Sequence, residues 1–294
     1  MTSSKVALVE CPRDAMQGWK DLISTGDKVE YINALLQVGF DTIDFGSFVS
    51  AKAIPQMADT REVIDKIDKK KSASKLLAII ANKRGAEEAA SFEKIDLLGF
   101  PFSISETFQQ RNGNSSIAAA HERLLDIREI TGKAGKGLVV YLSMGFGNHY
   151  GDPYSEEIVF EWADKINQMD VTLISIADTV GVAEAASISR LCKGLIATLG
   201  KAKFGLHLHS RPNNWREKIE AAWLSGCRRF DGALLGIGGC PMADDHLTGN
   251  IDMGKMINYF ESVNALPTLN REALTASLEM ASRIFSKTST GHNR

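Results

Sequence analysis

The sequence predicts a single (β/α)8 barrel, the TIM-barrel architecture. Short β-rich runs alternate along the chain with longer stretches of helical period, and eight such runs can be counted. The length of 294 residues suits one barrel of this kind. A doubly wound sheet more often shows a GxGxxG loop after its first strand, whereas this chain continues with Cys11-Pro-Arg-Asp14. The alternation therefore favours a closed barrel over an open sheet.

The predicted strands are short apolar runs with many β-branched side chains. In chain order they are Val6–Glu10, Thr42–Gly46, Lys75–Ile80, Ile95–Phe100, Leu138–Ser143, Leu173–Ala177, Phe204–His209 and Phe230–Leu235. Helical periodicity between them predicts helices over Asp27–Val38, Met57–Ile67, Ser115–Thr131, Ser155–Gln168 and Asn214–Ser225. Because a helix that connects two neighbouring strands makes them parallel, all eight strands should run in one direction.

The chain contains no linker, low-complexity segment or charge block that would divide it, which predicts one catalytic domain over residues 1–294. The barrel should occupy about residues 5–265. An amphipathic pattern over about residues 269–287 predicts one further helix, which is either a cap or an oligomer contact. A homodimer fits a barrel of this kind.

Charge and cysteine content exclude several classes of protein. The net charge is -2 and the one dense basic run, Lys69-Lys-Lys71, reads as a solvated helix end, so neither nucleic acid nor a membrane is an expected partner. Four scattered cysteines form no CxxC pair, which favours free thiols in a reducing compartment. No signal, transit or membrane-spanning pattern stands out, so a soluble cytoplasmic protein is expected.

Two histidines lie two residues apart in the seventh predicted strand, Phe204-Gly-Leu-His-Leu-His209. Residues two apart on a strand point to the same side, so His207 and His209 should project into one space. This spacing is typical of metal ligands, although one packed histidine and one at a strand end would give the same pattern. In a barrel, chemistry belongs at the carboxyl ends of the strands, where this pair lies.

A carboxylate, Asp14, follows the first predicted strand. With the two histidines it offers one hard oxygen and two nitrogens, a donor set that suits Mg²⁺, Mn²⁺, Fe²⁺, Co²⁺ or Zn²⁺. A carbonyl oxygen from Asn250 would be a fourth protein ligand, with open positions left for a chelating substrate. The structural alternative for Asp14 is an N-cap of the helix that follows it.

Other polar side chains lie at the same strand ends. Arg13 is a fixed positive charge suited to an oxyanion that develops during a reaction, or to a salt bridge with Asp44 or Glu106. Cys240 lies in a glycine-rich loop, where its thiol is either an acid/base group or a small packed hydrophobe. The remaining candidates, which would bind substrate or support the site, are Gln17, Asp44, Ser47, Ser105, Glu106, Ser143 and Thr179.

Six segments follow one another in a fixed order: Cys11–Gln17, Ser47–Met57, Ser105–Phe108, Asp178–Gly181, Gly205–His209, and Gly236–Pro241 with Gly249-Asn250. This ordered set resembles the motifs of the 3-hydroxy-3-methylglutaryl-CoA lyase family, within the metal-dependent lyase and Claisen-condensing TIM barrels. The resemblance runs from about residue 6 to residue 253, nearly the whole chain. The Ser-Phe-Val-Ser and Gly-Gly-Cys-Pro segments favour the lyases over their condensing relatives.

The resemblance implies retro-Claisen cleavage of 3-hydroxy-3-methylglutaryl-CoA to acetyl-CoA and acetoacetate, with an acyl-CoA as the binding partner. It implies Mg²⁺ or Mn²⁺ bound by Asp14, His207, His209 and Asn250. It assigns catalytic roles to Arg13, Asp14, His207 and Cys240, with Arg13 stabilising the enolate and Cys240 taking part in the proton transfers. Asp44 stands where those lyases usually carry a glutamate that supports the metal site. The pathway is left open between leucine degradation, ketone-body formation and something adjacent.

Three segments depart from the lyase pattern. Ser210-Arg211-Pro212-Asn213 stands where those enzymes continue with Asp-Thr, and its guanidinium can bind a carboxylate or a CoA phosphate, or pair with an acid. The loop from Cys240 to Asn250 is about one residue longer. Met144–Gly151 replaces a cysteine-containing loop, so His149 or His246 either contributes to catalysis or is an exposed loop histidine.

Two alternatives to this lyase remain. One is a relative with the same chemistry, either a lyase for another 3-hydroxyacyl-CoA or a synthase that joins acetyl-CoA to a 2-oxo acid. The other is a barrel that binds metal or acyl-CoA without turnover. The Gly-Gly-Cys-Pro loop argues against a synthase, and the retained Arg13, Asp14, histidine pair and Cys240 argue against loss of turnover.

Overall fold

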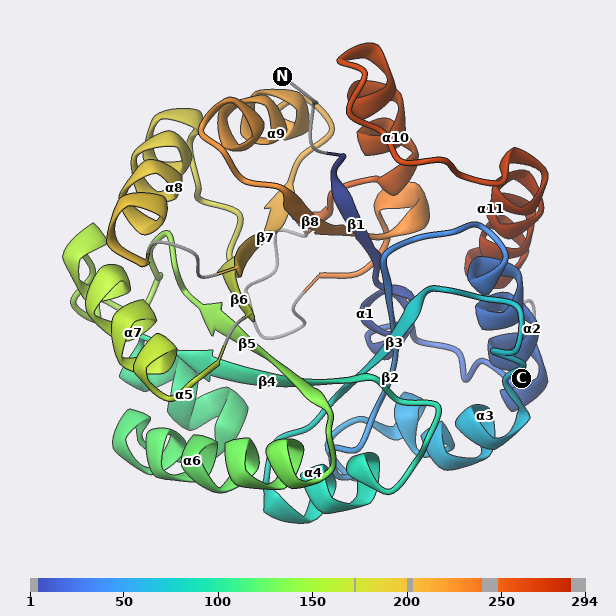
Figure 1. Cartoon of the computed structure of the whole chain (residues 1–294), viewed down its shortest axis with the longest axis horizontal. Coiled ribbons are helices and arrows are strands. Elements are labelled where there is room, and N and C mark those ends of the chain that lie inside the picture. Colours follow the sequence, from blue (N-terminus) through green and yellow to red (C-terminus); the bar gives the residue numbers. More distant parts are fainter. Residues whose placement is uncertain (1–4, 172, 200–202, 240–247, 287–294) are drawn as a thin grey trace, which may run out of the picture.

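A closed ring of parallel strands forms the centre of the molecule. The computed structural model describes residues 5–171, 173–199, 203–239 and 248–286. Strands β1 to β8 each pair in parallel with the next, and β8 pairs back with β1 (Figure 1). The predicted (β/α)8 barrel is confirmed.

Most predicted strands lie within one or two residues of the observed ones. The barrel strands are β1 (Ala7–Glu10), β2 (Thr42–Ser47), β3 (Lys75–Ile79), β4 (Leu97–Ser103), β5 (Gly137–Ser143), β6 (Leu173–Asp178), β7 (Lys203–Ser210) and β8 (Arg229–Gly232). A ninth short strand, β9 (Gly249–Asn250), pairs antiparallel with the end of β7. Beyond Gly99, β4 pairs only with β5, and its Pro101 lacks the N–H that pairing on the other side would use.

The helices surround the barrel (Figure 1). In chain order they are α1 (Pro12–Gln17), α2 (Thr25–Leu36), α3 (Thr60–Lys66), α4 (Lys83–Ala90), α5 (Glu106–Gly113), α6 (Ile117–Lys133), α7 (Glu156–Gln168), α8 (Ala185–Leu199), α9 (Trp215–Leu224), α10 (Met253–Ser262) and α11 (Arg271–Phe285). Side-chain oxygens of Ser24, Ser105, Ser116 and Ser155 accept backbone N–H groups at the starts of α2, α5, α6 and α7.

The eighth strand is shorter than the sequence predicts. It was expected to reach Leu235, but β8 ends at Gly232 and Leu234–Gly236 forms a 3-10 turn (η2) in which Leu235 has a φ of 65°. The backbone N–H of Leu234 donates to Oε1 of the buried Glu10 at 2.9 Å. A buried side chain on β1 therefore ends the strand, which local propensity does not reveal.

The helix predicted over Met57–Ile67 is divided into a 3-10 turn, η1 (Pro55–Met57), and α3. The hydroxyl of Thr60 donates to the carbonyl of Met57 at 2.8 Å and accepts the N–H of Ser47 at 3.1 Å. This contact with β2 fixes the break between the two segments.

The main hydrophobic core lies between the outer face of the barrel and the helices, where residues such as Leu8, Ile43, Phe100 and Phe230 are fully buried. A smaller cluster of Leu77, Ile79, Val139 and Tyr141 comes from β3 and β5, the strands on either side of β4. The described cysteines Cys11, Cys192 and Cys227 are buried free thiols, as expected.

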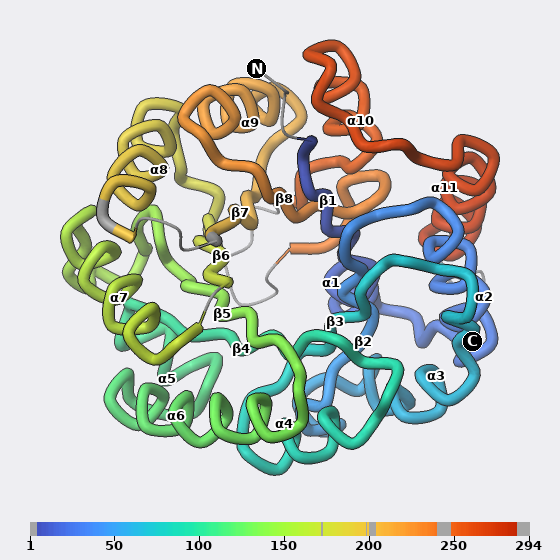
Figure 2. The backbone as a smooth tube through the Cα atoms, viewed as in Figure 1, coloured from blue at the N-terminus to red at the C-terminus, as the bar shows by residue number. Residues whose placement is uncertain are grey.

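The last helix, α11, packs against α2 near the start of the chain (Figure 2). The ring of Phe285 lies edge-on to Trp19, with centroids 5.2 Å apart, and to Tyr31 at 6.5 Å. The additional C-terminal helix predicted over about residues 269–287 is therefore present and covers the barrel side near α1 and α2. Within the described ranges, no helix combines the length and apolar character needed to cross a membrane.

Candidate active site

The polar residues predicted to form a site gather at the carboxyl ends of the strands. Asp14 lies in the first turn of α1, directly after β1, and is buried. The N-cap position of α1 belongs to Cys11, so the alternative that Asp14 is the N-cap is wrong. The six-residue helix α1 begins at Pro12, so Asp14 lies within its first turn and its side chain points to the barrel mouth.

The two histidines of β7 lie together as their spacing predicts. Their ring centroids are 5.2 Å apart. Nδ1 of His209 lies 3.0 Å from the carbonyl of Thr179, which fixes this nitrogen as the donor and leaves Nε2 with its lone pair. One ligand atom each from Asp14, His207 and His209 lies within 4.8 Å of the others, a separation that one metal ion can span.

Asn250 completes this group because β9 pairs with the end of β7, in a register that sets Asn250 opposite His209. Its Nδ2 donates to Oδ2 of Asp14 at 2.7 Å and to the carbonyl of Ile237 at 2.9 Å. Both amide hydrogens are thereby used, and the buried Oδ1 has no partner among the described residues. The side chain is held with its oxygen free.

Two buried acceptors in this cluster, Nε2 of His209 and Oδ1 of Asn250, therefore have no hydrogen-bond partner in the described part of the chain. Buried polar atoms in native proteins are nearly always hydrogen-bonded, so two unpaired acceptors here indicate a binding site for a ligand. An ionised carboxylate, Asp14, adjoins them. This donor set of carboxylate, amide oxygen and imidazole nitrogens fits a divalent cation.

The charges around the cluster suit cation binding. Burial acts to raise the pKa of Asp14, but the positive charges of Arg13 and the histidines and the hydrogen bond from Asn250 outweigh it, so the pKa is lowered. Burial, together with the neighbouring His207, lowers the pKa of His209 to about 4. Asp14 is thus ionised and His209 neutral at pH 7, the protonation states that metal ligands need.

The pKa of His207 is shifted in the opposite direction to that of His209. Burial acts to lower its pKa, but the carboxylates of Asp231 and Asp14 outweigh burial and raise it. Nδ1 of His207 lies 3.5 Å from Oδ2 of Asp231, within ion-pair range but too far for a good hydrogen bond. The imidazole therefore lies between an acid on β8 and the cluster around Asp14.

Arg13 pairs with Asp44, one of the two acids predicted for it. Nε and Nη2 of Arg13 donate to the Asp44 carboxylate, and Nη1 donates to Asp14 at 3.0 Å and to Gln17 at 2.8 Å. Four of its five N–H groups thus have partners, and the second N–H of Nη2 has none within the described ranges. Gln17 in turn donates to Asp14 at 3.0 Å, so Arg13, Asp14, Gln17 and Asp44 form one buried network.

Asp44 reaches Arg13 from an irregular point of the barrel, since the register between β2 and β3 shifts between Asp44 and Gly46. Burial raises the pKa of Asp44 even though Arg13 opposes the change. A carboxyl with a raised pKa depends on its cation partner to stay ionised.

The other predicted polar residues mainly serve local structure. Ser105 caps α5 and also donates to Asp152, while Oε2 of the exposed Glu106 accepts the N–H of Ile117 at 3.1 Å. Glu106 is thus turned toward α6, and the predicted alternative of a bond with Arg13 is wrong. The further residues with local contacts are Ser47, whose Oγ accepts the N–H of Val49, Thr179, whose Oγ1 accepts that of Met144, and Ser143, whose carbonyl accepts that of Ile104.

Several predictions concern residues that this geometry does not join to the cluster. His149 is exposed in the loop after β5 and takes no part in the groups of potential metal ligands found among the described residues. Cys240 and His246 lie outside the described residues.

Two buried charged residues beside the histidines were not predicted from the sequence. Asp231 on β8 faces His207, and Lys218 on α9 donates to Asp178 at 2.7 Å and to the carbonyl of His209 at 2.8 Å. An acid within the apolar run Phe230–Leu235 was the available signal for Asp231. Lys218 gave none, because a lysine on an amphipathic helix usually faces solvent.

A second group of potential ligands, Cys11, His207 and Asp231, shares His207 with the first. Burial strongly raises the pKa of the Cys11 thiol, and nearby carboxylates add to the effect. Metals bind the thiolate, so this environment disfavours Cys11 as a ligand. The group around Asp14 is the better metal centre.

The glycine-rich segment after η2 rests directly on this centre. Gly238 has a φ of 94°, and a Cβ at this position would lie 2.7 Å from Nδ2 of Asn250 and 2.8 Å from the carbonyl of Asp14. Only glycine allows this close approach.

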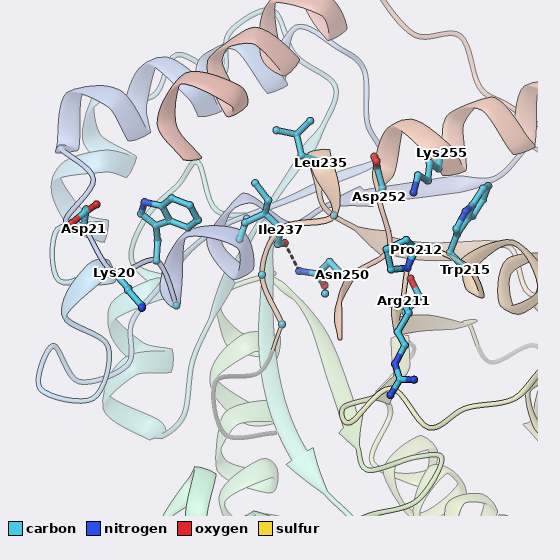
Figure 3. Close-up of a pocket in the computed structure, with 18 residues that line it drawn as sticks. Lys20, Asp21, Arg211, Pro212, Trp215, Leu235, Ile237, Asn250, Asp252 and Lys255 are labelled. Atoms are coloured by element: carbon cyan, nitrogen blue, oxygen red, sulfur yellow. Dashed lines mark hydrogen bonds between the residues drawn. The ribbon is translucent and has the colours of Figure 1, made fainter. Parts of the chain in front are cut away.

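A cavity of about 750 Å³ opens beside Asn250. Figure 3 shows Asn250 bonded to the carbonyl of Ile237, with Arg211, Trp215 and Lys255 on one side and Lys20 on the other. The wall is aromatic and aliphatic apart from these cations, two acids and a few polar groups. The cavity is large enough for a substantial part of a cofactor-sized molecule.

A parallel eight-stranded barrel with a polar cluster at the carboxyl ends of its strands has the architecture of TIM-barrel enzymes. Comparison with known proteins gives the family: the chain belongs to the HMGL-like family, whose model matches residues 5–280. It is 33% identical to the 3-hydroxy-3-isohexenylglutaryl-CoA/hydroxy-methylglutaryl-CoA lyase of Pseudomonas aeruginosa, over 84% of this chain and 82% of that protein.

Two further relatives agree with this family. A hydroxymethylglutaryl-CoA lyase of Bacillus subtilis is 29% identical over 93% of this chain and 91% of its own length. The solved structure of an HMG-CoA lyase from Acinetobacter baumannii, in complex with coenzyme A and 3-methylmalate, superimposes with a TM-score of 0.90 at 27% identity, covering 99% of this chain and 95% of that one. The resemblance seen in the sequence motifs is confirmed.

Proposed function

We propose that this chain is a carbon–carbon lyase that cleaves 3-hydroxy-3-methylglutaryl-CoA to acetyl-CoA and acetoacetate with the aid of a divalent cation. The observation that carries this proposal is the pair of orphaned buried acceptors, on His209 and Asn250, set around the Asp14 carboxylate. Family membership and relatives that bear the lyase name support the same reaction.

The residues that would hold the cation are Asp14, His207, His209 and Asn250. Of the two expected ions, Mn²⁺ accepts imidazole more readily than Mg²⁺, which prefers oxygen ligands and water. A divalent cation bound there would supply Lewis-acid chemistry to a substrate that chelates it through its oxygens.

The chain's own residues would handle charge and protons. Loss of the proton from the tertiary hydroxyl lets the bond between C2 and C3 break, and the electron pair moves onto the thioester as an enolate. Nη2 of Arg13 has a second N–H that no described residue accepts, and this N–H can donate to the enolate oxygen. Protonation of the enolate carbon gives acetyl-CoA. We assign the proton transfers to Cys240, because His207 would hold the cation.

The cavity beside Asn250 supports an acyl-CoA substrate. Coenzyme A carries several phosphate charges, and the cavity presents the cations Lys20, Arg211 and Lys255 together with Trp215 (Figure 3). The Acinetobacter baumannii enzyme was solved with coenzyme A bound. Arg211, one of the departures from the lyase pattern, fits the role of a phosphate or carboxylate partner.

The test is a cleavage assay on purified protein. The protein is treated with EDTA, given 3-hydroxy-3-methylglutaryl-CoA with or without Mg²⁺ or Mn²⁺, and followed by the release of acetoacetate. Acetoacetate that appears only with metal supports the proposal, and Asp14→Ala should give neither metal binding nor product. If the wild type binds Mn²⁺ in calorimetry but releases no acetoacetate, this substrate is wrong and longer 3-substituted analogues should be assayed.

The remaining sequence predictions are part of the same proposal. A homodimer would be checked by light scattering after gel filtration. A cytoplasmic location and a role in leucine degradation would be checked by fractionation of the source cells and by growth of a deletion strain on leucine.

A further inference from the structure

The barrel interior beside the proposed metal centre holds a second ionic group, the buried pair of Arg229 and Asp231. Asp231 on β8 has a side chain with no exposed surface, and it lies opposite His207 of β7 in the parallel ladder. Oδ1 of Asp231 accepts from Nη1 of Arg229 at 2.9 Å, and Oδ2 lies 3.5 Å from both Nδ1 of His207 and Oγ of Ser175. The carboxylate is therefore held on one side and directed at His207 on the other.

His207 has a matching unused atom. Its Nδ1 is buried and has no hydrogen-bond partner among the described residues. A neutral imidazole carries its proton on one nitrogen only, and a carboxylate can accept a proton but cannot donate one. A short approach of His207 toward Asp231 would give Nδ1 its missing hydrogen bond.

The orientation of the His207 ring decides which of its nitrogens can bind a metal ion together with Asp14 and His209. When Nδ1 faces Asp231, the lone pair of His207 is on Nε2, the nitrogen at the other side of the ring. Histidine ligands commonly donate their second N–H to a carboxylate in this way, and loss of that partner weakens metal binding about 10- to 100-fold. His209 is oriented by a backbone carbonyl, that of Thr179, whereas no backbone group of the described residues accepts from Nδ1 of His207.

We propose that Asp231 is a positioning residue, anchored by Arg229, that fixes His207 with its proton on Nδ1 and its lone pair on Nε2 toward Asp14 and His209. This inference rests on the metal centre of the proposed function. It assigns a role to the buried Arg229–Asp231 pair, which the cleavage mechanism itself does not use. Arg229 holds the carboxylate in place, and Asp231 acts on the reaction only through His207.

The first measurement is made on the wild-type protein. In metal-free protein labelled with ¹⁵N-histidine at pH 8.5, two-bond proton–nitrogen correlations report the tautomer of each ring, and a His207→Gln spectrum identifies the His207 signals. The expected result is the Nδ1–H tautomer in the wild type. A wild-type His207 that carries its proton on Nε2 would overturn the proposal.

The second measurement is the affinity for Mn²⁺ by calorimetry. Asp231→Asn should bind Mn²⁺ about 10- to 100-fold more weakly than the wild type and should lose the fixed tautomer. The matched control is Asp96→Asn, since Asp96 precedes β4 at the opposite end of the barrel, where it accepts the N–H of Leu76 and pairs with Lys69. This control should lose stability and keep its Mn²⁺ affinity.

The outcomes separate the two proposals. An Asp231→Asn protein that stays folded and binds Mn²⁺ within twofold of the wild type would overturn the positioning role, whether or not the wild type cleaves 3-hydroxy-3-methylglutaryl-CoA. A wild type that binds Mn²⁺ and shows the Nδ1–H tautomer but releases no acetoacetate would refute the proposed substrate. The role of Asp231 would be unaffected.

Discussion

Replacement of Arg13 by glutamine tests the proposed chemistry most directly. The substitution removes a guanidinium with four hydrogen-bonded N–H groups from a position that is only 8% exposed. Loss of one donor to a developing oxyanion typically lowers turnover about 10²- to 10³-fold, or roughly 3–4 kcal/mol. Because the cluster around Asp14 keeps all of its ligand atoms, Mn²⁺ affinity should not fall.

The same substitution should also destabilise the fold, since it leaves Asp44 buried without its cation. Loss of one partner from a buried ion pair costs about 3–5 kcal/mol. Burial already raises the pKa of Asp44, and removal of Arg13 raises it further, so the native carboxyl of the variant binds a proton that the unfolded chain does not. The stability of Arg13→Gln should therefore decrease as pH rises from 5 to 8, whereas Arg13→Gln with Asp44→Asn should lack this dependence.

Three measurements decide the outcome: turnover from acetoacetate release, Mn²⁺ binding by calorimetry, and the free energy of unfolding in urea. The double variant separates catalysis from stability, because it should recover stability without recovering turnover. A stable double variant with nearly normal turnover would refute the role of Arg13. A loss of Mn²⁺ affinity equal to the loss of turnover would show that Arg13 acts through the metal centre instead.

Three further predictions follow from the same contacts. Cys240→Ser should slow cleavage without lowering the unfolding temperature, and a large drop in that temperature would instead indicate a packed thiol. In EDTA, lowering the pH from 6.5 to about 4 should destabilise the wild type more than His209→Gln, by up to about 3 kcal/mol, because His209 stays neutral in the fold while the unfolded histidine takes up a proton; equal pH slopes in urea unfolding would contradict this. Lys218→Met should lower the free energy of unfolding by about 3–5 kcal/mol because it leaves the buried Asp178 without its cation. The double variant Lys218→Met with Asp178→Asn should be less destabilised. Urea curves in which the two proteins are equally unstable would show that the ion pair is not the cause.

The fold could be predicted from local patterns because each strand and helix carries its own periodicity. The eight strands could be predicted from hydrophobic content and β-branched side chains alone. Their parallel direction followed from the helices between them. Two predicted boundaries were wrong, at Leu235 and within Met57–Ile67. The side chains of Glu10 and Thr60 set these boundaries through hydrogen bonds to other segments of the chain. Local propensity contains no information about such bonds.

The sequence by itself determined that His207 and His209 share one side of a strand, because that depends only on the two-residue period of β structure. It also placed Asp14 and Arg13 at a strand end, and the motif order indicated the family. These properties belong to short segments or to the order of segments along the chain.

Only the tertiary structure decided how the site is completed. Asp14 and Asn250 are 236 residues apart in sequence, and their 2.7 Å hydrogen bond, which leaves Oδ1 of Asn250 free, depends on the pairing of β9 with β7. The choice of Asp44 over Glu106 as partner of Arg13, and the approach of Asp231 to His207, likewise depend on which strands become neighbours when the barrel closes. A single sequence gives each residue's chemistry, but the distances between side chains on different strands exist only after the barrel has closed.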